Sequence, residues 1–243
     1  ISTRDWSSDV CSSDLLQISV DGRQDYFTDG FGHILNHERR KREKLRKKSH
    51  ILLGRYLADQ MSEVYSLQQH RKAFCLGNIM PDLRPSFLTT RHEFFGTFSQ
   101  LQEKMRELIE RNPEEDNARV YWRRFGEVMH YMADYFTFPH NRTYKGSLAE
   151  HNSYEAELKN CLKECILSGN ADSQLEEAKH FDSFEELVGY IRERHACYLE
   201  SPRCIADDIR FILRVCYQVI QGIFQLCLRR QFHMEGRDRK SVV

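Results

Sequence analysis

One stretch decides the fold class that this sequence predicts: EDNARVYWRRFGEVMHYMADYFT, residues 115–137. It carries helical signals throughout and ends just before Pro139, at which a helix usually stops. It also contains His130 and Asp134, four residues apart. On a helix that spacing places both side chains on one face, about one turn apart. The stretch is therefore predicted to be a helix that presents an imidazole and a carboxylate side by side.

The chain on either side is predicted to be helical as well, since no convincing alternation typical of strands occurs after Ser49. The segment 74–85 is the exception: it is interrupted by glycine and proline and is predicted to be a loop that contains Asp82. The fold class is therefore all-α, as a compact multi-helix single domain. Helices are expected at 49–66, 94–111, 115–137, from His151 and Glu155 to a cap at Gly169, 184–199 and 205–228.

Both ends of the printed sequence resemble translated sequencing-library adapter, in DWSSDVCSSDL (5–15) and DRKSVV (238–243). The stretch 16–44 lacks methionine and a clear apolar period, and it ends in the charged run ERRKREK. It is interpreted either as untranslated sequence upstream of a start at Leu45 or as a basic, disordered arm. The domain is accordingly expected at 45–236, with 1–44 and 237–243 outside it.

Composition indicates a globular protein, with 40% hydrophobic and 12% aromatic residues. The 36 basic and 36 acidic side chains cancel, so no overall field attracts nucleic acid or an anionic membrane. No segment is expected to span a bilayer, which takes roughly 18 apolar residues, and no secretory apolar region precedes the domain. Seven of the eight cysteines lie outside the adapter-like tip, and none forms a Cys-x-x-Cys pair. The protein is therefore expected to be soluble and cytoplasmic, with reduced thiols.

Residues of the types that bind zinc follow one another within 74 residues, and a further histidine precedes them. Two pairs among them have the i,i+4 spacing that suits chelation on a helix face. Imidazole nitrogen and carboxylate oxygen are the ligands of catalytic zinc sites, which keep one position open. The pattern favours a hydrolytic zinc centre over a structural one. Its members are His50, Asp82, His92, His130, Asp134, His140, His151 and Glu155.

The remaining histidines have no such context, and the aromatic clusters around the ligands are expected to be helical core more than a ligand pocket. Those histidines are expected to be solvated or satisfied by hydrogen bonds. The residues concerned are His70, His180, His195 and His233, and the aromatic Phe94, Phe95, Tyr131, Tyr135, Phe136 and Phe138.

Over roughly 49–158 the chain resembles the bacterial zinc-dependent phospholipases C, a compact all-α family. In that family an early Ser-His opens the first helix, and an aspartate in a loop and a histidine follow. A His-x-x-x-Asp pair, a histidine six residues later and a His-x-x-x-Glu pair complete the order. Here these read Ser49-His50, Asp82, His92, His130 with Asp134, His140, and His151 with Glu155.

The resemblance implies two zinc ions and leaves a third open. The first ion would be bound by Asp82, His92, His130 and Asp134, and the second by His140, His151 and Glu155. In the family, Asp134 would bridge to a third ion completed by His50 and by the amino group and carbonyl of an N-terminal tryptophan. Trp6 is the one tryptophan upstream of His50; it lies in adapter-like sequence at the wrong spacing, so the third site lacks this partner.

The activity that the resemblance implies is cleavage of a glycerophospholipid to diacylglycerol and a phosphorylated headgroup, at a membrane surface. Asp82 is the candidate for orienting or deprotonating the attacking water. Two alternatives stay open. One is a zinc-dependent single-strand nuclease or nucleotidase of the same fold, which would need a base-stacking aromatic and a basic track. The other is a non-catalytic, zinc-stabilised helical protein that binds a lipid or a protein partner. Headgroup preference and oligomeric state are not specified by the sequence.

Overall fold

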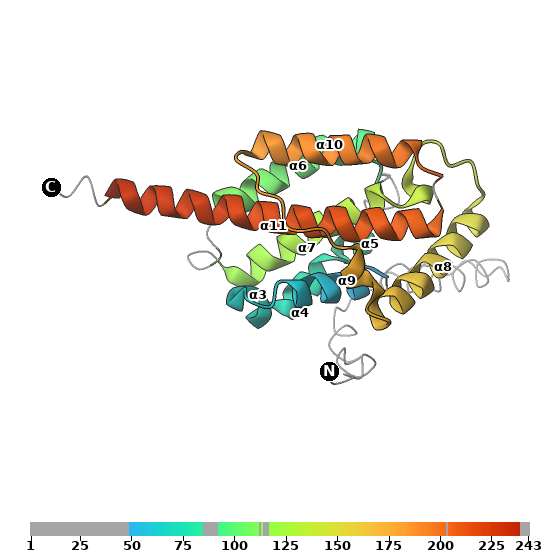
Figure 1. Ribbon diagram of the computed structural model, residues 1–243, viewed down its shortest axis with the longest axis horizontal. Coiled ribbons are helices and arrows are strands. Elements are labelled where there is room, and N and C mark those ends of the chain that lie inside the picture. The colour runs from blue at the N-terminus through green and yellow to red at the C-terminus, as the bar shows by residue number, and fades with distance from the viewer. Residues whose placement is uncertain (1–48, 85–91, 112, 114–116, 203, 239–243) are drawn as a thin grey trace, which may run out of the picture. The chain divides into compact units, whose positions relative to one another are not determined.

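The computed structural model describes residues 49–84, 92–111, 113, 117–202 and 204–238, with side chains up to 232. Every regular element in these ranges is a helix and no strand occurs in them, which confirms the all-α prediction (Figure 1). The predicted limits of the domain at 45 and 236 remain predictions. The helices are residues 49–60, α3 (Tyr65–Gln69), α4 (Arg71–Gly77), α5 (Met80–Leu83), α6 (Phe94–Glu110), α7 (Ala118–Tyr135), η2 (Phe138–His140), α8 (Leu148–Leu167), α9 (Asn170–Gln174), α10 (Phe184–Glu200) and α11 (Ile205–Asp238).

Helix α7 is the central element, because it packs against α4, α5, α6 and α11. It begins at Ala118 because the side chain of Asn117 accepts a hydrogen bond from the Val120 N–H (3.2 Å) and so caps the helix. Its side chains are almost continuously buried from Tyr121 to Tyr135. A helix buried nearly all round brings its polar side chains into the core as well, and these include both members of the predicted pair.

Two glycines allow α4 and α7 to approach closely. A Cβ at Gly77 would lie 2.0 Å from the carbonyl oxygen of Arg123, and one at Gly126 would lie 2.1 Å from that of Phe74. Backbone atoms cannot move aside as a flexible side chain can, so only glycine fits these two positions. The close packing also brings the backbone at Asn78 against α7.

The segment 74–85 differs from the predicted loop, since it contains the end of α4 and the short helix α5. Pro81 lies in the first turn of α5, where the missing proline N–H removes no intrahelical hydrogen bond. Asp82 therefore lies on a helical turn. The first helix also stops earlier than predicted, at residue 60, and Gln68 donates to the carbonyls of Ala58 and Met61 at its end (2.8 and 3.1 Å).

Helix α8 begins with a capping box, in which Ser147 and Glu150 satisfy each other's backbone N–H groups. It is followed by Gly169, whose φ of 78° lies in the left-handed region that favours glycine after a helix. The next short helix, α9, was not predicted.

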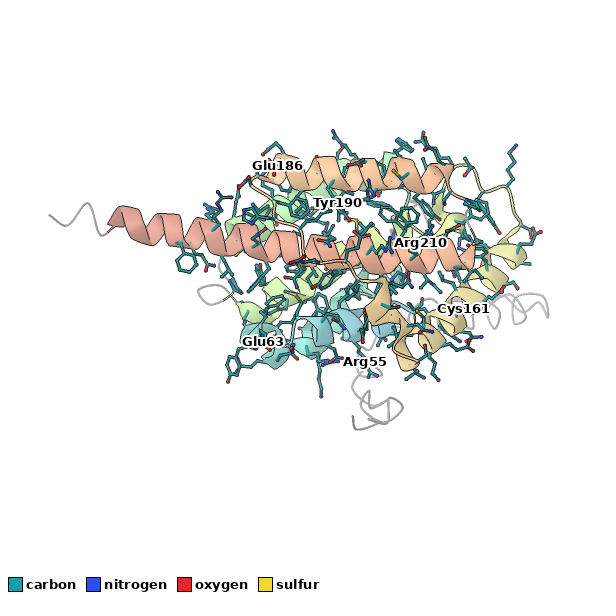
Figure 2. All side chains as sticks on the ribbon, viewed as in Figure 1. Arg55, Glu63, Cys161, Glu186, Tyr190 and Arg210 are labelled. Atoms are coloured by element: carbon teal, nitrogen blue, oxygen red, sulfur yellow. The ribbon has the colours of Figure 1, made fainter. Side chains whose placement is uncertain are left out.

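Helix α11 packs against α6, α7, α8, α9 and α10 and carries much of the core. Tyr190 of α10 lies on the side facing α11, whereas Glu63 and Glu186 are exposed (Figure 2). Within the described residues, α11 alone is long and apolar enough to cross a membrane, over residues 205–232, which the sequence analysis did not expect. Because 61% of its most apolar window is buried, it has the character of a core helix.

Candidate metal centre

All eight predicted ligands lie in the described part of the chain, and the fold brings them together in three groups, two of which share His130. The candidate ligand atoms of each group lie within 4.8 Å of one another. We name them the first cluster, which contains His50, Asp82, His92, His130 and Asp134 in two groups that share His130, and the second cluster, which contains His140, His151 and Glu155.

Asp134 lies at the centre of the first cluster. Its Oδ1 is 3.2 Å from His50 Nε2, and its Oδ2 is 2.9 Å from His92 Nδ1. The same Oδ2 is 3.2 Å from His130 Nε2, which realises the predicted i,i+4 pair on α7. It is also 3.8 Å from His140 Nδ1, in the second cluster. One buried carboxylate thus faces four imidazoles from four segments of the chain.

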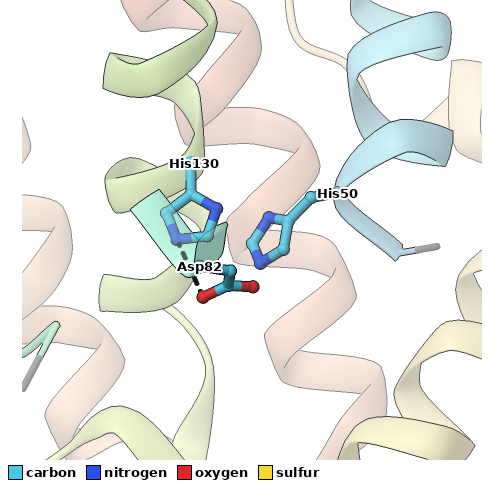
Figure 3. A group of neighbouring side chains, drawn as sticks. All are labelled: His50, Asp82 and His130. Atoms are coloured by element: carbon cyan, nitrogen blue, oxygen red, sulfur yellow. Dashed lines mark ion pairs between the residues drawn. The ribbon is translucent and has the colours of Figure 1, made fainter. Parts of the chain in front are cut away.

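The orientation of His130 follows from the packing of α4 on α7. Its Nδ1 lies 2.8 Å from the carbonyl oxygen of Asn78, which can only accept, so Nδ1 donates. Nε2 then faces the carboxylates, 3.2 Å from Asp134 Oδ2 and 3.6 Å from Asp82 Oδ1. Figure 3 shows His130 from α7, Asp82 from α5 and His50 from the first helix converging on one point. The close glycine contact between α4 and α7 therefore helps to direct the candidate ligand nitrogen of His130 towards the carboxylates.

The electrostatics of the first cluster favour positive charge. Burial opposes protonation of His130, but the carboxylates of Asp134 and Asp82 outweigh it and raise the pKa of His130 to about 9. Burial would raise the pKa of Asp134, but the imidazoles of His140, His130 and His50 hold it well below its usual range. Burial and the nearby His130 lower the pKa of His50. Without a metal ion, the carboxylates thus favour a proton on His130 and the imidazoles favour ionised Asp134, and a bound cation would take the place of that proton.

The second cluster is more open. Glu155 Oε1 lies 2.7 Å from His151 Nε2, one turn earlier on α8, and 3.3 Å from His140 Nε2. The side chains of His140 and His151 are 11% and 16% exposed, whereas in the first cluster His50 is 11% exposed and the other four members are at most 5% exposed. His140 is directed here by η2, the short turn that follows the end of α7.

A small cavity of about 30 Å³ separates the two clusters. Its lining includes His50 and Asp134 on one side and His140 and Glu155 on the other, together with the apolar Leu53, Leu158 and Leu162. A cavity of this size has room for about one water molecule, which would lie among candidate ligands of both clusters.

The donor atoms fit a zinc ion. Asp82 Oδ2 is buried and has no hydrogen-bond partner among the described residues, which is costly unless a cation lies beside it. The ring nitrogens His130 Nε2 and His92 Nδ1 lie only 3.2 Å apart, as two ligands of a single ion can. Imidazole and carboxylate are ligands that zinc prefers. These contacts support a zinc centre but leave the role of each residue a prediction.

Glu127 was missed by the sequence analysis. Its buried carboxylate lies 2.6 Å from Arg84 and 3.3 Å from Lys104, so it connects the chain just after Asp82 to α7. Glu127 lies three residues before His130 and seven before Asp134, so all three share one face of α7. This spacing could have identified Glu127 from the sequence.

Histidines outside the clusters behave largely as expected. His195 is buried, stacks on Phe94 with ring centroids 3.9 Å apart, and has Nε2 3.3 Å from Asn141 Oδ1. His70 Nδ1 lies 3.0 Å from the Ser66 carbonyl, and His180 is exposed. The side chain of His233 and all of Trp6 lie outside the described residues.

The aromatic residues near the clusters are mostly core, as predicted. Phe94, Tyr135 and Phe136 are buried, whereas Phe95 is 63% exposed. The guanidinium of Arg142 lies over the Phe95 ring, 5.3 Å from its centroid.

One family model matches the chain: it is described as zinc dependent phospholipase C and covers residues 49–205, more than half of the sequence. The match begins at the Ser49-His50 pair and contains all eight predicted ligands. Neither the curated proteins nor the solved structures give a match.

Proposed function

The chain belongs to the zinc-dependent phospholipase C family, and on this premise we propose that it is a zinc-dependent phosphodiesterase that cleaves a glycerophospholipid to diacylglycerol and a phosphorylated headgroup. The observation that carries the proposal is the cavity between the clusters, which is lined by candidate ligands from both. A water molecule or a single phosphoryl oxygen in this cavity would meet candidate ligands of both clusters at once.

The first cluster would hold one ion through Asp82, His92, His130 and Asp134, and the second cluster would hold another through His140, His151 and Glu155. Zinc, when bound, supplies polarisation of phosphoryl oxygens and a lower pKa for bound water. A third ion is proposed between His50 and Asp134 Oδ1, which lie 3.2 Å apart. That ion would need further ligands, which these two residues do not supply.

Asp82 is proposed to orient the attacking water and to accept its proton. Its Oδ1 faces His130, whereas its Oδ2 is buried without a hydrogen-bond partner among the described residues. A carboxylate has two oxygens, so Asp82 could bind the ion through one of them and accept a hydrogen bond from the attacking water through the other. The apolar side chains of Leu53, Leu158 and Leu162 line the cavity between the two clusters, and they would limit the number of competing waters there.

The test is zinc per chain, by elemental mass spectrometry on protein purified without chelator, together with hydrolysis of phosphatidylcholine vesicles. Two or three zinc ions and release of phosphocholine are expected. His130→Ala and Glu155→Ala should each lose zinc and activity together, while His180→Ala, at an exposed histidine, should change neither. Full zinc content in both ligand variants would overturn the assignment.

The same preparation distinguishes the alternatives. Cleavage of single-stranded DNA without cleavage of any phospholipid would identify a nuclease of this fold. One zinc ion or none in folded protein, with neither substrate cleaved, would identify a non-catalytic relative that binds a lipid or a partner.

A further inference from the structure

Asp208 is a buried carboxylate in the first turn of α11, beyond the last residue that the family model matches. Its Oδ2 accepts hydrogen bonds from the Phe138 N–H and from the Tyr154 hydroxyl, both at 2.9 Å. Its Oδ1 accepts a hydrogen bond from the Tyr198 hydroxyl at 2.7 Å. A side chain with 0% exposure therefore receives three donors from three different elements.

Two of these donors belong to the segments that carry the second cluster. Phe138 begins η2, which ends at His140 two residues later. Tyr154 lies on α8 directly before Glu155 and three residues after His151. One oxygen of Asp208 thus holds both η2 and α8. The third donor, Tyr198, lies on α10, which carries none of the candidate ligands.

The second cluster needs such a connection, because its ligands come from separate elements. His151 and Glu155 are held relative to each other by α8, but His140 lies on a turn of three residues. The packing of the Phe138 ring against Tyr154, with centroids 6.1 Å apart, supports the same junction. Groups that orient ligands typically change metal affinity by about 10- to 100-fold when they are removed.

Burying a carboxylate costs free energy unless hydrogen bonds compensate for the lost hydration. Burial raises the pKa of Asp208 to about 6, against the hydrogen bonds from Tyr198, Phe138 and Tyr154 that favour the ionised form. The three donors are the physical compensation for that burial. Because two of these donors come from η2 and α8, their hydrogen bonds to Asp208 also fix the spacing between these two elements.

We propose that Asp208 is a positioning residue that holds His140 in register with His151 and Glu155 and thereby sets the zinc affinity of the second cluster alone. The proposal rests on the proposed function, since it requires the second cluster to bind zinc. It extends that function to a residue outside the matched region.

The experiment compares two variants that each delete one hydroxyl donor to the same carboxylate. Full-length protein, Tyr154→Phe and Tyr198→Phe are titrated with zinc against a chromophoric chelator. The binding step that disappears in Glu155→Ala identifies the second cluster. Tyr154→Phe is expected to weaken that step by about tenfold or more. Tyr198→Phe should leave it within about twofold, and the other zinc step should not change in either variant.

Asp208→Asn is expected to weaken the same step at least as much as Tyr154→Phe. Thermal unfolding of each zinc-free variant reports whether it is folded, and the tyrosine pair keeps the test valid if Asp208→Asn is not. Equal weakening by both tyrosine variants would indicate a general loss of stability and would overturn the proposal, as would no weakening by Tyr154→Phe. Wild-type protein that binds no zinc would overturn the proposed function as well, which separates the two failures.

Discussion

The first and second clusters use the same ligand types but are built in different ways. The first is centred on α7 and is held by backbone packing, with Gly77 and Gly126 in direct contact between α4 and α7. The second lies on η2 and the beginning of α8, and its segments are connected through hydrogen bonds to Asp208. The first is closed to solvent except at His50, whereas both histidines of the second are partly exposed.

A hydrolytic centre needs both rigidly held ligands and access for the substrate, and the two clusters differ in which of these they provide. Packed helices fix ligands rigidly, but they leave little room for a substrate. A cluster built on a short turn and the beginning of one helix, connected by hydrogen bonds, leaves an edge open. The closed cluster should therefore contribute more to folding stability, and the open cluster should be where the substrate phosphate first arrives.

Asp134→Ala should have the largest effect on stability. It removes the carboxylate that faces His50, His92, His130 and His140, and it leaves His130 buried without the carboxylate that contributes most to its raised pKa. Breaking a buried ion pair on one side costs about 3–5 kcal/mol. Urea unfolding of the zinc-free protein measures this cost. A loss below about 1 kcal/mol would contradict the view that the first cluster is part of the core.

Gly126→Ala should have the next largest effect on stability. It should lower the free energy of unfolding by about 1–3 kcal/mol, because overpacking forces two backbones apart. The new Cβ would meet the Phe74 carbonyl at 2.1 Å and displace Asn78 from His130. Zinc binding by the first cluster should weaken, while the second keeps its affinity. The matched control is Gly189→Ala on α10, where nothing lies within 4 Å of a Cβ. That variant should gain up to about 1 kcal/mol from helix propensity.

His195 links stability to pH at the junction between the clusters, since it contacts both Phe94 and Asn141. Burial lowers its pKa to about 4, from 6.5 in the unfolded chain. The unfolded chain therefore gains a proton as pH falls below 6.5 while the folded protein does not, and stability decreases towards pH 4. His195→Phe should reduce the stability difference between pH 7 and pH 5 by about 2 kcal/mol. Guanidinium unfolding at both pH values measures this, and an unchanged difference would refute it.

Glu155→Ala should remove zinc from the second cluster at a smaller cost in stability, about 1–2 kcal/mol for zinc-free protein. The reason is that its partners His140 and His151 reach solvent and can rehydrate. Unfolding experiments set beside those on Asp134→Ala give the comparison directly. Equal losses would show that the two clusters do not differ in how they support the fold.

His180→Ala should have the smallest effect: the free energy of unfolding should change by no more than about 0.5 kcal/mol, and the zinc content should not change. Its ring is exposed and interacts with Asp182 and Gln225, away from both clusters. Thermal unfolding and elemental analysis check it, and a loss of zinc here would mean that the centre extends beyond the eight ligands.

Much of the centre could be predicted because it is local. The pairs His130 with Asp134 and His151 with Glu155 follow from helix geometry and were placed correctly on α7 and α8. Asp82 was expected in a loop and lies on α5, since a proline in the first turn does not prevent a helix. Glu127 was missed although its position on the face of α7 with His130 was visible in the sequence.

The sequence by itself determined the all-α class, the ligand types and the spacing within each pair, because a helix converts separation along the chain into separation in space. Only the tertiary structure decided that Asp134 faces four imidazoles, that Gly77 meets Gly126, and that Asp208 connects η2 to α8. These contacts join residues that are far apart in the chain. They depend on how closely the helices pack and on which side they turn inward, and no spacing along the chain specifies either.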